Sequence, residues 1–167
     1  MNILIRPETG TDHDAIEALT VAAFLNAPHT DHNEQRIVRD LRQAGALSLS
    51  LVAEQEGRVV GHLCFSPVTI SDGCPHWYGL GPISVSPALH GRGLGSRLMD
   101  AGLAELKGMG AAGCVVLGDP GFYGRFGFVS EPGLTPPGVP AEYFMARSFG
   151  AAMPRGEVCY HPAFVQA

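Results

Sequence analysis

The chain has 167 residues and a net charge of −5, with 46% hydrophobic and 16% charged residues. This length and balance predict one globular domain over 1–167 with a sizeable core, and they exclude a disordered chain. The negative charge leaves no basic surface for nucleic acid, so we expect no nucleic-acid partner. A mildly acidic protein suits a cationic or amine substrate, although ordinary solubility explains the same charge.

The cysteines and the apolar segments indicate the cellular compartment of the protein. Cys64, Cys74, Cys114 and Cys159 contain no C-x-x-C pair, which argues against a structural zinc site or a disulfide framework. The N-terminal run MNILIRP is too short and too soon polar for a signal peptide. No apolar run approaches the roughly 18 residues that span a membrane. We therefore expect a cytoplasmic protein with no membrane partner and no metal.

The N-terminal half of the chain predicts a strand, two helices and then a series of strands. Apolar residues recur at helical spacing in both helices, and Gly45 ends the second. The turn Glu-Gln-Glu-Gly at 54–57 joins two strands as a hairpin. The expected elements are a strand at 2–6, helices at 13–25 and 34–42, and strands at 47–53, 58–68 and 77–85.

The C-terminal half predicts a helix, a short buried strand and several shorter elements. Asp119 followed by Pro120 is typical of a helix N-cap and first helical position. The expected elements are helices at 94–107 and 121–126, strands at 113–117, 143–148 and 158–161, a strand beginning at 128–129, and a loop at 132–140. The order predicts an α/β (α+β) fold, with a mixed sheet covered by helices on both faces.

The segment SVSPALHGRGLGSRLM, residues 84–99, is the most informative part of the sequence. A short apolar strand ends at Val85, glycines follow at Gly91, Gly93 and Gly95, and an apolar helix begins where the glycines stop. Glycines let a backbone approach a phosphate closely, and the first amides of a helix have no internal partners. This pattern predicts a site for a phosphorylated cofactor.

The spacing of the glycines separates several phosphate-binding motifs. A dinucleotide fingerprint needs its third glycine one residue later, where Ser96 stands, and a Walker motif needs a lysine, whereas Lys107 is the only lysine of the chain. What remains is a pyrophosphate held by the backbone amides of 91–96, with help from Arg92 or Arg97. A tight turn that binds nothing is the alternative.

A second motif, GDPGFYGRFGF at 118–128, follows the expected buried strand at 113–117. It carries Tyr123, whose residue type combines an apolar ring with a polar hydroxyl. The tyrosine is therefore either a catalytic residue or an aromatic core residue.

Together the two segments resemble the GCN5-related N-acetyltransferase (GNAT) superfamily. That family's Gln/Arg-x-x-Gly-x-Gly/Ala motif after the fourth strand reads here His90-Gly91-Arg92-Gly93-Leu94-Gly95. Its later Tyr-x-x-x-Gly-Phe motif reads Tyr123-Gly-Arg-Phe-Gly127-Phe128, at the matching distance. The segments LGPI at 80–83 and LGDP at 117–120 resemble a bacterial subgroup of predicted acetyltransferases. The resemblance covers nearly the whole chain.

The resemblance implies a GNAT fold, with a mixed central sheet of about six or seven strands whose parallel strands four and five splay apart. Acetyl-CoA would lie in that splay, and no metal would be needed. An amide near Ile83 would polarise the thioester carbonyl, and Tyr123 would act as general acid toward the departing thiolate. The implied cofactor-binding residues are Ile83, Ser84, Val85, His90, Gly91, Arg92, Gly93, Leu94, Gly95 and Ser96.

The chain departs from the family pattern in two ways. His90 replaces the usual Gln or Arg of the glycine motif. Many members carry a Glu or His base on strand four, where this chain has Gly79 and Gly81. A neutral amine must lose a proton, so we predict Glu34 as the base. His76, Tyr78 or a chain of waters are the alternatives, and Glu34 also fits an ordinary first-turn acid of a helix.

The resemblance implies transfer of an acetyl group from acetyl-CoA to a primary amine of a small molecule or peptide, by direct attack. Two alternatives stay open: an acyl-CoA-binding sensor module without catalysis, which the missing strand-four acid favours, and a different nucleotide-binding α/β domain. The sequence is compatible with a monomer or a homodimer.

Overall fold

The computed structural model describes residues 2–27, 30–136, 141–150 and 152–165. Every strand or helix of five residues or more matches an expected element to within two residues at each end. The helices are α1 (His13–Phe24), α2 (Glu34–Gln43), α3 (Leu94–Gly108) and α4 (Pro120–Tyr123). The strands are β1 (Ile3–Pro7), β2 (Leu49–Gln55), β3 (Arg58–Pro67), β4 (Thr69–Ile70), β5 (Trp77–Val85), β6 (Gly113–Leu117), β7 (Val129–Ser130), β8 (Leu134–Thr135), β9 (Phe144–Ser148) and β10 (Gly156–Cys159).

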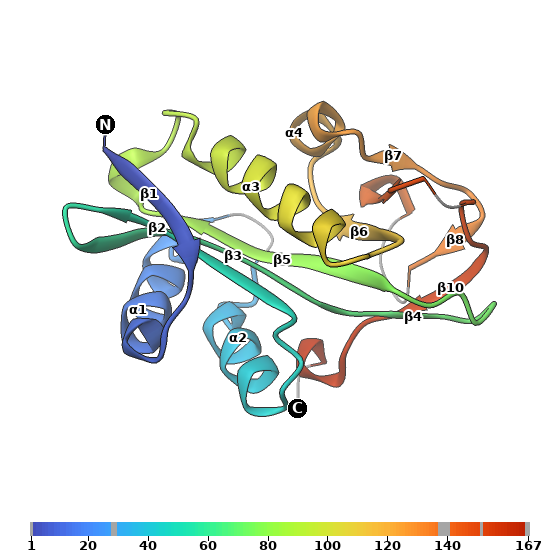
Figure 1. Ribbon diagram of the computed structural model, residues 1–167, viewed down its shortest axis with the longest axis horizontal. Helices are drawn as coiled ribbons and strands as arrows, with labels where there is room; N and C mark the ends of the chain where they lie inside the picture. The colour runs from blue at the N-terminus through green and yellow to red at the C-terminus, as the bar shows by residue number, and fades with distance from the viewer. Residues whose placement is uncertain (1, 28–29, 137–140, 151, 166–167) are drawn as a thin grey trace.

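A seven-stranded mixed sheet forms the centre of the molecule, in the order β1-β2-β3-β5-β6-β9-β7. Its one parallel pair is β5 with β6, and the other pairs are antiparallel. Helix α3 covers one face, while α1 and α2 lie on the other (Figure 1). The predicted mixed sheet with helices on both faces is therefore confirmed.

The helices pack through the apolar faces that the sequence predicted. In α2, Ile37, Val38 and Leu41 are buried, because residues three and four apart share one side of a helix. Helix α3 lies close enough to β3 that a Cβ added at Gly102 would meet the Phe65 ring at 3.0 Å. The glycine inside this helix therefore allows a close approach between helix and sheet.

The parallel strands β5 and β6 separate partway along their length. Their pairing runs from Trp77 opposite Gly113 to Gly79 opposite Val115, and β5 then continues along β3 alone as far as Val85. Gly81 has a φ of 126°, a conformation that residues with a side chain rarely adopt. The predicted splay is therefore present, and it begins after Gly79.

Strands β4, β10 and β8 form a second, three-stranded sheet, near the start of β5 (Figure 1). The expected late strand at 158–161 lies at 156–159 and belongs to this small sheet. Strand β8 falls in the expected loop at 132–140, of which 137–140 lie outside the described residues. Two-residue strands such as β4 and β8 are too short for a period-2 pattern to register, so only their pairing with β10 defines them.

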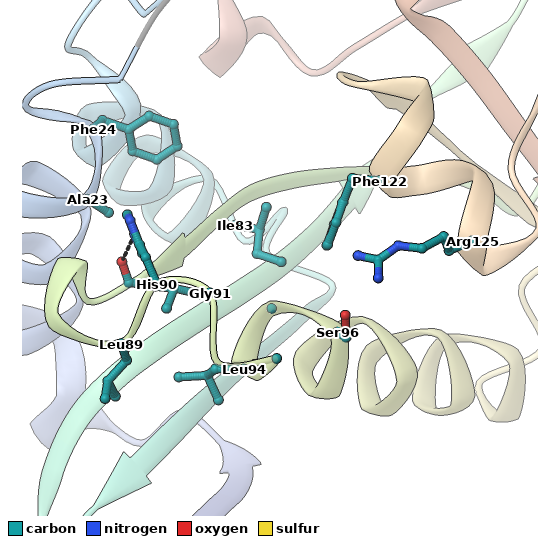
Figure 2. A pocket seen from close by; sticks show the side chains of 13 residues that line it. Ala23, Phe24, Ile83, Leu89, His90, Gly91, Leu94, Ser96, Phe122 and Arg125 are labelled. Carbon is teal, nitrogen blue, oxygen red and sulfur yellow. Dashed lines mark hydrogen bonds between the residues drawn. The ribbon is translucent and has the colours of Figure 1, made fainter.

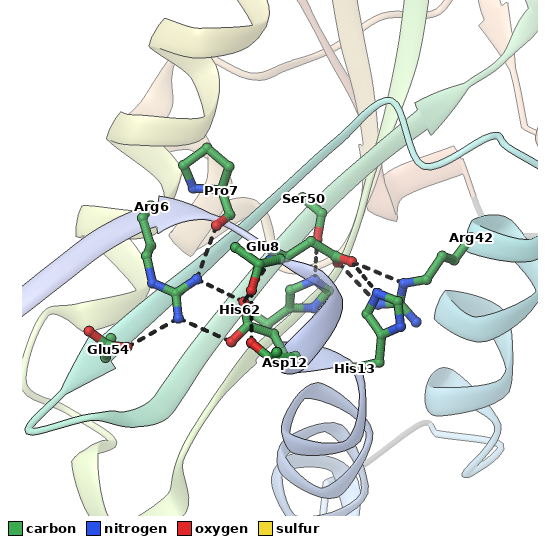
Figure 3. Close-up of polar contacts among 11 residues, drawn as sticks. Arg6, Pro7, Glu8, Asp12, His13, Arg42, Ser50, Glu54 and His62 are labelled. Atoms are coloured by element: carbon green, nitrogen blue, oxygen red, sulfur yellow. Dashed lines mark hydrogen bonds and ion pairs between the residues drawn. The ribbon is translucent and has the colours of Figure 1, made fainter.

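A polar network joins β1, β2 and β3 to α1 and α2 (Figure 3). Arg42 donates two hydrogen bonds of 3.0 Å to Glu8, which also accepts a short bond from the Ser50 hydroxyl. Ser50 Oγ lies 2.8 Å from Nε2 of the fully buried His62. Burial lowers the pKa of His62 to about 4, although the charge of Glu8 opposes this effect. This network therefore contains a histidine that stays neutral where a free histidine would be charged.

The carboxylates of this network are held ionised. Hydrogen bonds from Arg6 hold the pKa of Asp12 well below its usual range, against the opposing effect of burial. Burial would raise the pKa of Glu8, but hydrogen bonds from Arg42 and Ser50 outweigh it and lower this pKa.

Two features are absent from the described residues. No helix among them is long and apolar enough to cross a membrane. Within the same residues, no group of three His, Cys, Asp or Glu side chains is placed to hold a metal ion.

Candidate functional site

The glycine turn connects β5 to α3 with the backbone shape that the glycines allow. Gly91 and Gly93 have φ angles of 78° and 79°, in the left-handed region. Gly93 is the N-cap of α3, and no side chain caps the helix there. The first amides of α3 are therefore free of side-chain partners and available to an anion.

A cavity of about 540 Å³ lies over this turn, and we call it the turn cavity (Figure 2). Eight of the predicted cofactor-binding residues line it, whereas Ser84 and Arg92 are not among the lining residues. The predicted residues that line it are Ile83, Val85, His90, Gly91, Gly93, Leu94, Gly95 and Ser96, and those that the sequence reasoning missed are Ala23, Phe24, Leu89, Phe122 and Arg125.

The edge of β5 that faces the splay offers backbone groups. The Ser86 amide donates to the Val60 carbonyl across the β3 ladder at 2.8 Å. By the alternation of an antiparallel pair, Ser84 then also points its amide toward β3, while Ile83 and Val85 point theirs away from it. Ser84 is 2% exposed, so its side chain lies in the interior beside β3.

His90 makes a different contact from the predicted one. Its Nε2–H donates to the Val85 carbonyl at 2.9 Å, and Val85 is one of the implied cofactor-binding residues. A ligand that binds to the Val85 carbonyl must therefore replace its exposed hydrogen bond from His90. Contact between His90 and a phosphate stays a prediction.

Arg125 is the cation that lines the turn cavity. Its guanidinium lies over the Phe122 ring at 5.0 Å and over the Phe126 ring at 5.6 Å. Arg97, in contrast, donates to the Ile3 carbonyl at 3.2 Å, and Arg92 is exposed outside the lining. Arg125 is far from the glycines in sequence, and the one signal for it was its place inside the tyrosine motif.

A second cavity, of about 790 Å³, lies on the other side of the splay, and we call it the aromatic cavity. Tyr123 and Glu34, the two predicted catalytic residues, both line it. Phe24 and Ile83 line both cavities, so the two adjoin. The alternative bases His76 and Tyr78 line neither cavity.

Tyr123 is held by the short helix α4. The side chain of Asp119 accepts the Gly121 amide at 3.0 Å, which confirms the predicted N-cap. The tyrosine ring packs edge-on against Phe122 and Phe128, at centroid distances of 5.0 and 6.1 Å. Burial, and to a lesser degree the charge of Asp119, raise the pKa of Tyr123 to about 12. The hydroxyl is therefore a neutral hydrogen-bond donor across the ordinary pH range.

Gly118 determines where the Tyr123 ring can lie. A Cβ added at Gly118 would overlap the ring edge, with its Cδ2 at 3.1 Å and its Cζ at 3.4 Å. The glycine of the LGDP segment is therefore a close-packing position beneath the tyrosine.

Glu34 is the first residue of α2, after the N-cap Asn33. Its Oε2 accepts the Thr30 hydroxyl at 2.6 Å, while Oε1 is buried and has no hydrogen-bond partner. A carboxylate interacts favourably with a helix N-terminus, which supports the alternative that Glu34 is an ordinary first-turn acid. The unpartnered oxygen leaves capacity for a ligand as well.

Tyr160, which the sequence reasoning did not single out, occupies the space beside Gly79. A Cβ added at Gly79 would meet the Tyr160 ring at 3.4 and 3.6 Å. The hydroxyl of Tyr160 is buried without a hydrogen-bond partner, and burial holds its pKa well above the usual value. The space over Gly79, where the family resemblance led us to look for a base, is therefore filled by Val68 and by Tyr160, the residue after β10.

Comparison with known proteins supports the predicted family. The model of the acetyltransferase (GNAT) family matches residues 13–128. The uncharacterized N-acetyltransferase YhbS of Escherichia coli K12 is 40% identical over 127 residues, which cover 75% of this chain and 73% of YhbS.

Two solved structures are similar over almost the whole chain. A GNAT family acetyltransferase from Brucella melitensis in complex with acetyl-CoA has a TM-score of 0.88 and 47% identity, and covers 98% of this chain and 99% of its own. E. coli YhbS in complex with CoA has a TM-score of 0.86 and 35% identity, over 98% and 92% of the two chains. The motifs, the splayed sheet and these relatives agree, and the chain belongs to the GNAT acetyltransferase family.

Proposed function

We propose that this protein transfers the acetyl group of acetyl-CoA to a primary amine by direct attack. The observation that carries the proposal is the meeting of the two cavities at the splay of β5 and β6, where Phe24 and Ile83 line both. One cavity offers free helix amides to a pyrophosphate, and the other contains Tyr123 and Glu34. The relatives solved with acetyl-CoA or CoA support the same assignment.

The residues of the turn cavity fit the cofactor. The amides that follow Gly93 would hold the pyrophosphate, and Arg125 would add a positive charge beside it. The outward backbone groups of Ile83 and Val85 would pair with the pantetheine arm, as a strand pairs with an open edge. When bound, acetyl-CoA supplies an acetyl group activated as a thioester.

Tyr123 would act on the sulfur side of the reaction. As the amine nitrogen bonds to the carbonyl carbon, the carbon–sulfur bond breaks and the sulfur leaves with the electron pair. The neutral Tyr123 hydroxyl donates to that sulfur. Because its pKa of about 12 lies above that of a free thiol, a hydrogen bond that stabilises the thiolate is favoured over complete proton transfer.

Glu34 would act on the amine side. Glu34 lines the cavity that holds Tyr123, and its Oε1 has no hydrogen-bond partner, so the proton lost by the amine would have a carboxylate to receive it. Thr30 holds the second oxygen at 2.6 Å and orients the group. A chain of waters that leads to Glu34 would give the same balance of protons.

A non-catalytic acyl-CoA-binding module is the second candidate, and the observation that favours it is Gly79. A packed Tyr160 ring, with a neutral hydroxyl, stands where many relatives have a base. Such a protein would bind acetyl-CoA without transferring its acetyl group.

Two measurements on the intact chain separate these functions. Calorimetric titration with acetyl-CoA tests the cofactor assignment, with NAD as the control ligand, and an absence of acetyl-CoA binding would overturn it. Release of free thiol from acetyl-CoA is then followed across a panel of amines. Thiol release that depends on the amine supports the enzyme, whereas tight binding with no release for any amine supports the binding module.

A further inference from the structure

The aromatic cavity carries charge of one sign. Asp31 and Glu34 line it, and none of its described lining residues is a lysine or arginine. One oxygen of Glu34 is buried without a partner, although the other accepts from Thr30. A cation entering the cavity is attracted by these two carboxylates, whereas a carboxylate meets like charge and no counter-ion among the described lining residues.

His161 also lines this cavity, and its hydrogen bonding limits what it can receive. Its Nδ1 accepts the Ala163 amide at 3.0 Å. A neutral imidazole with Nδ1 in use as an acceptor carries its proton on Nε2. His161 therefore presents a neutral donor, which suits a carbonyl or hydroxyl oxygen and provides no full charge for a carboxylate.

Aromatic side chains also line this cavity. Tyr160 and Phe164 pack edge to face with their centroids 5.2 Å apart, and both line the cavity with Phe24. The buried Tyr160 hydroxyl has no partner within the protein. Aromatic faces favour apolar groups and also attract cations. The cavity thus combines an apolar surface, a polar hydroxyl and an acidic end.

From this arrangement we propose that the acceptor is an alkyl- or arylalkylamine with no carboxylate near its amino group. Its ammonium lies toward Glu34 and Asp31, and its apolar body packs against Tyr160 and Phe164. The cavity volume of about 790 Å³ is that of a small-molecule site. This inference rests on the proposed function, because it names the acceptor of the same reaction.

A matched series of ligands tests the proposal. Phenethylamine, phenylalaninamide and phenylalanine share one aromatic body, and only phenylalanine carries a carboxylate. We expect kcat/KM to be at least about tenfold higher for phenethylamine than for phenylalanine, with the amide between them, because charge and not size separates the series. Equal or faster turnover of phenylalanine would overturn the proposal.

Binding separates failure of this proposal from failure of the proposed function. Each ligand is titrated calorimetrically into the protein loaded with CoA, so the measurement needs no turnover. Binding of phenethylamine over phenylalanine, without thiol release in the enzyme assay, supports the cavity's ligand class and overturns acetyl transfer. Binding of none of the three overturns the ligand class itself.

A single substitution tests whether charge determines the preference among these ligands. Asp31 is exposed and screened by solvent, so Asp31→Asn should lower the preference for phenethylamine over phenylalanine by only about two- to threefold, and by less in high salt. Asp14→Asn removes an exposed carboxylate of α1 that lines neither cavity and should leave the preference unchanged. An unchanged preference in Asp31→Asn, or an equal change in both variants, would contradict the electrostatic basis of the proposal.

Discussion

The turn cavity and the aromatic cavity are built from different parts of the chain. The polar groups of the turn cavity are mostly backbone amides and carbonyls, supplied by 83–96. The aromatic cavity owes its chemistry to the side chains of Glu34, Tyr123 and Tyr160, which come from segments far apart in sequence. The two adjoin through Phe24 and Ile83.

This difference predicts which substitutions each cavity tolerates. A backbone site depends on the path of the chain, so it is sensitive to strain at its glycines and insensitive to most side chains. A side-chain site depends on individual functional groups and on the packing that orients them. We therefore expect substitutions in the turn cavity to act on cofactor affinity and substitutions in the aromatic cavity to act on turnover.

The largest expected effect is on turnover. Tyr123→Phe should lower kcat by about 10² to 10³-fold, the usual contribution of one hydrogen-bond donor to a developing negative charge, while acetyl-CoA binds as tightly as before. Steady-state thiol release and calorimetry measure the two quantities. Tyr143→Phe is the matched control, since Tyr143 is exposed and lines neither cavity. Full turnover in Tyr123→Phe would remove the acid role, and a joint loss of binding would break the separation between the cavities.

Acid should loosen both cavities together, because His62 on β3 lies opposite Ser84 on β5, between Ile83 and Val85. The pKa of His62 is lowered to about 4, whereas an unfolded histidine titrates near about 6.5. Below that value the unfolded chain binds a proton that the folded chain does not. Stability should therefore be complete above about pH 6.5 and fall by about 3 kcal/mol by about pH 4.

Urea unfolding at a series of pH values measures this loss. His62→Gln retains an amide for Ser50 and removes the titration, so its free energy of unfolding should vary less between pH 6.5 and 4 than that of the wild type. The pKa values of Glu8 and Asp12 are lowered from 4.5 and 3.8, so their stabilisation begins to be lost only near those values and falls mainly at lower pH. An identical slope in the variant would show that other groups carry the acid sensitivity.

A smaller effect is expected on cofactor affinity. Gly93→Ala places a side chain at a φ of 79°, which costs about 1 to 2 kcal/mol unless the turn moves. Movement of the turn displaces the amides of α3, so the Kd for acetyl-CoA should rise about tenfold, with kcat at saturation unchanged. Gly73→Ala is the control, since Gly73 has a φ of 82° with open space around it and lines neither cavity. Equal affinity in both variants would contradict a backbone-held pyrophosphate.

The smallest effect distinguishes two arginines. Arg125→Met should raise the Kd for acetyl-CoA by about three- to tenfold at low salt, and by less as salt is added. Arg92→Met should change it less, because Arg92 is exposed outside the turn cavity. The reverse order would restore Arg92 as the cation of the site.

The turn cavity could be predicted largely from sequence because its parts are local. The glycines, the end of β5 and the start of α3 lie within a few residues of one another, so one motif specifies both the backbone path and the free amides. Ser84 and Arg92 were predicted as part of that site and do not line the cavity. For Ser84, the alternation along β5 turns its side chain to the interior.

The aromatic cavity was predictable only in part. Tyr123 and Glu34 were singled out separately, one from a motif and one from its place at a helix start, and no local pattern related them. Tyr160 carries no local signal, because its role depends on the small sheet that pairs β10 with β4 and on the space that Gly79 of β5 leaves open.

The sequence by itself determined the order of the longer elements and the glycine turn, because helix periodicity and glycine spacing act over short stretches of chain, and the resemblance of two motifs pointed to the family. The tertiary structure alone decided that Arg125 lines the turn cavity and that Tyr160 fills the place of a strand base. It also brought Glu34 and Tyr123 into one cavity. These placements depend on packing between distant segments, and that packing is settled only when the sheet splays and the helices close over it.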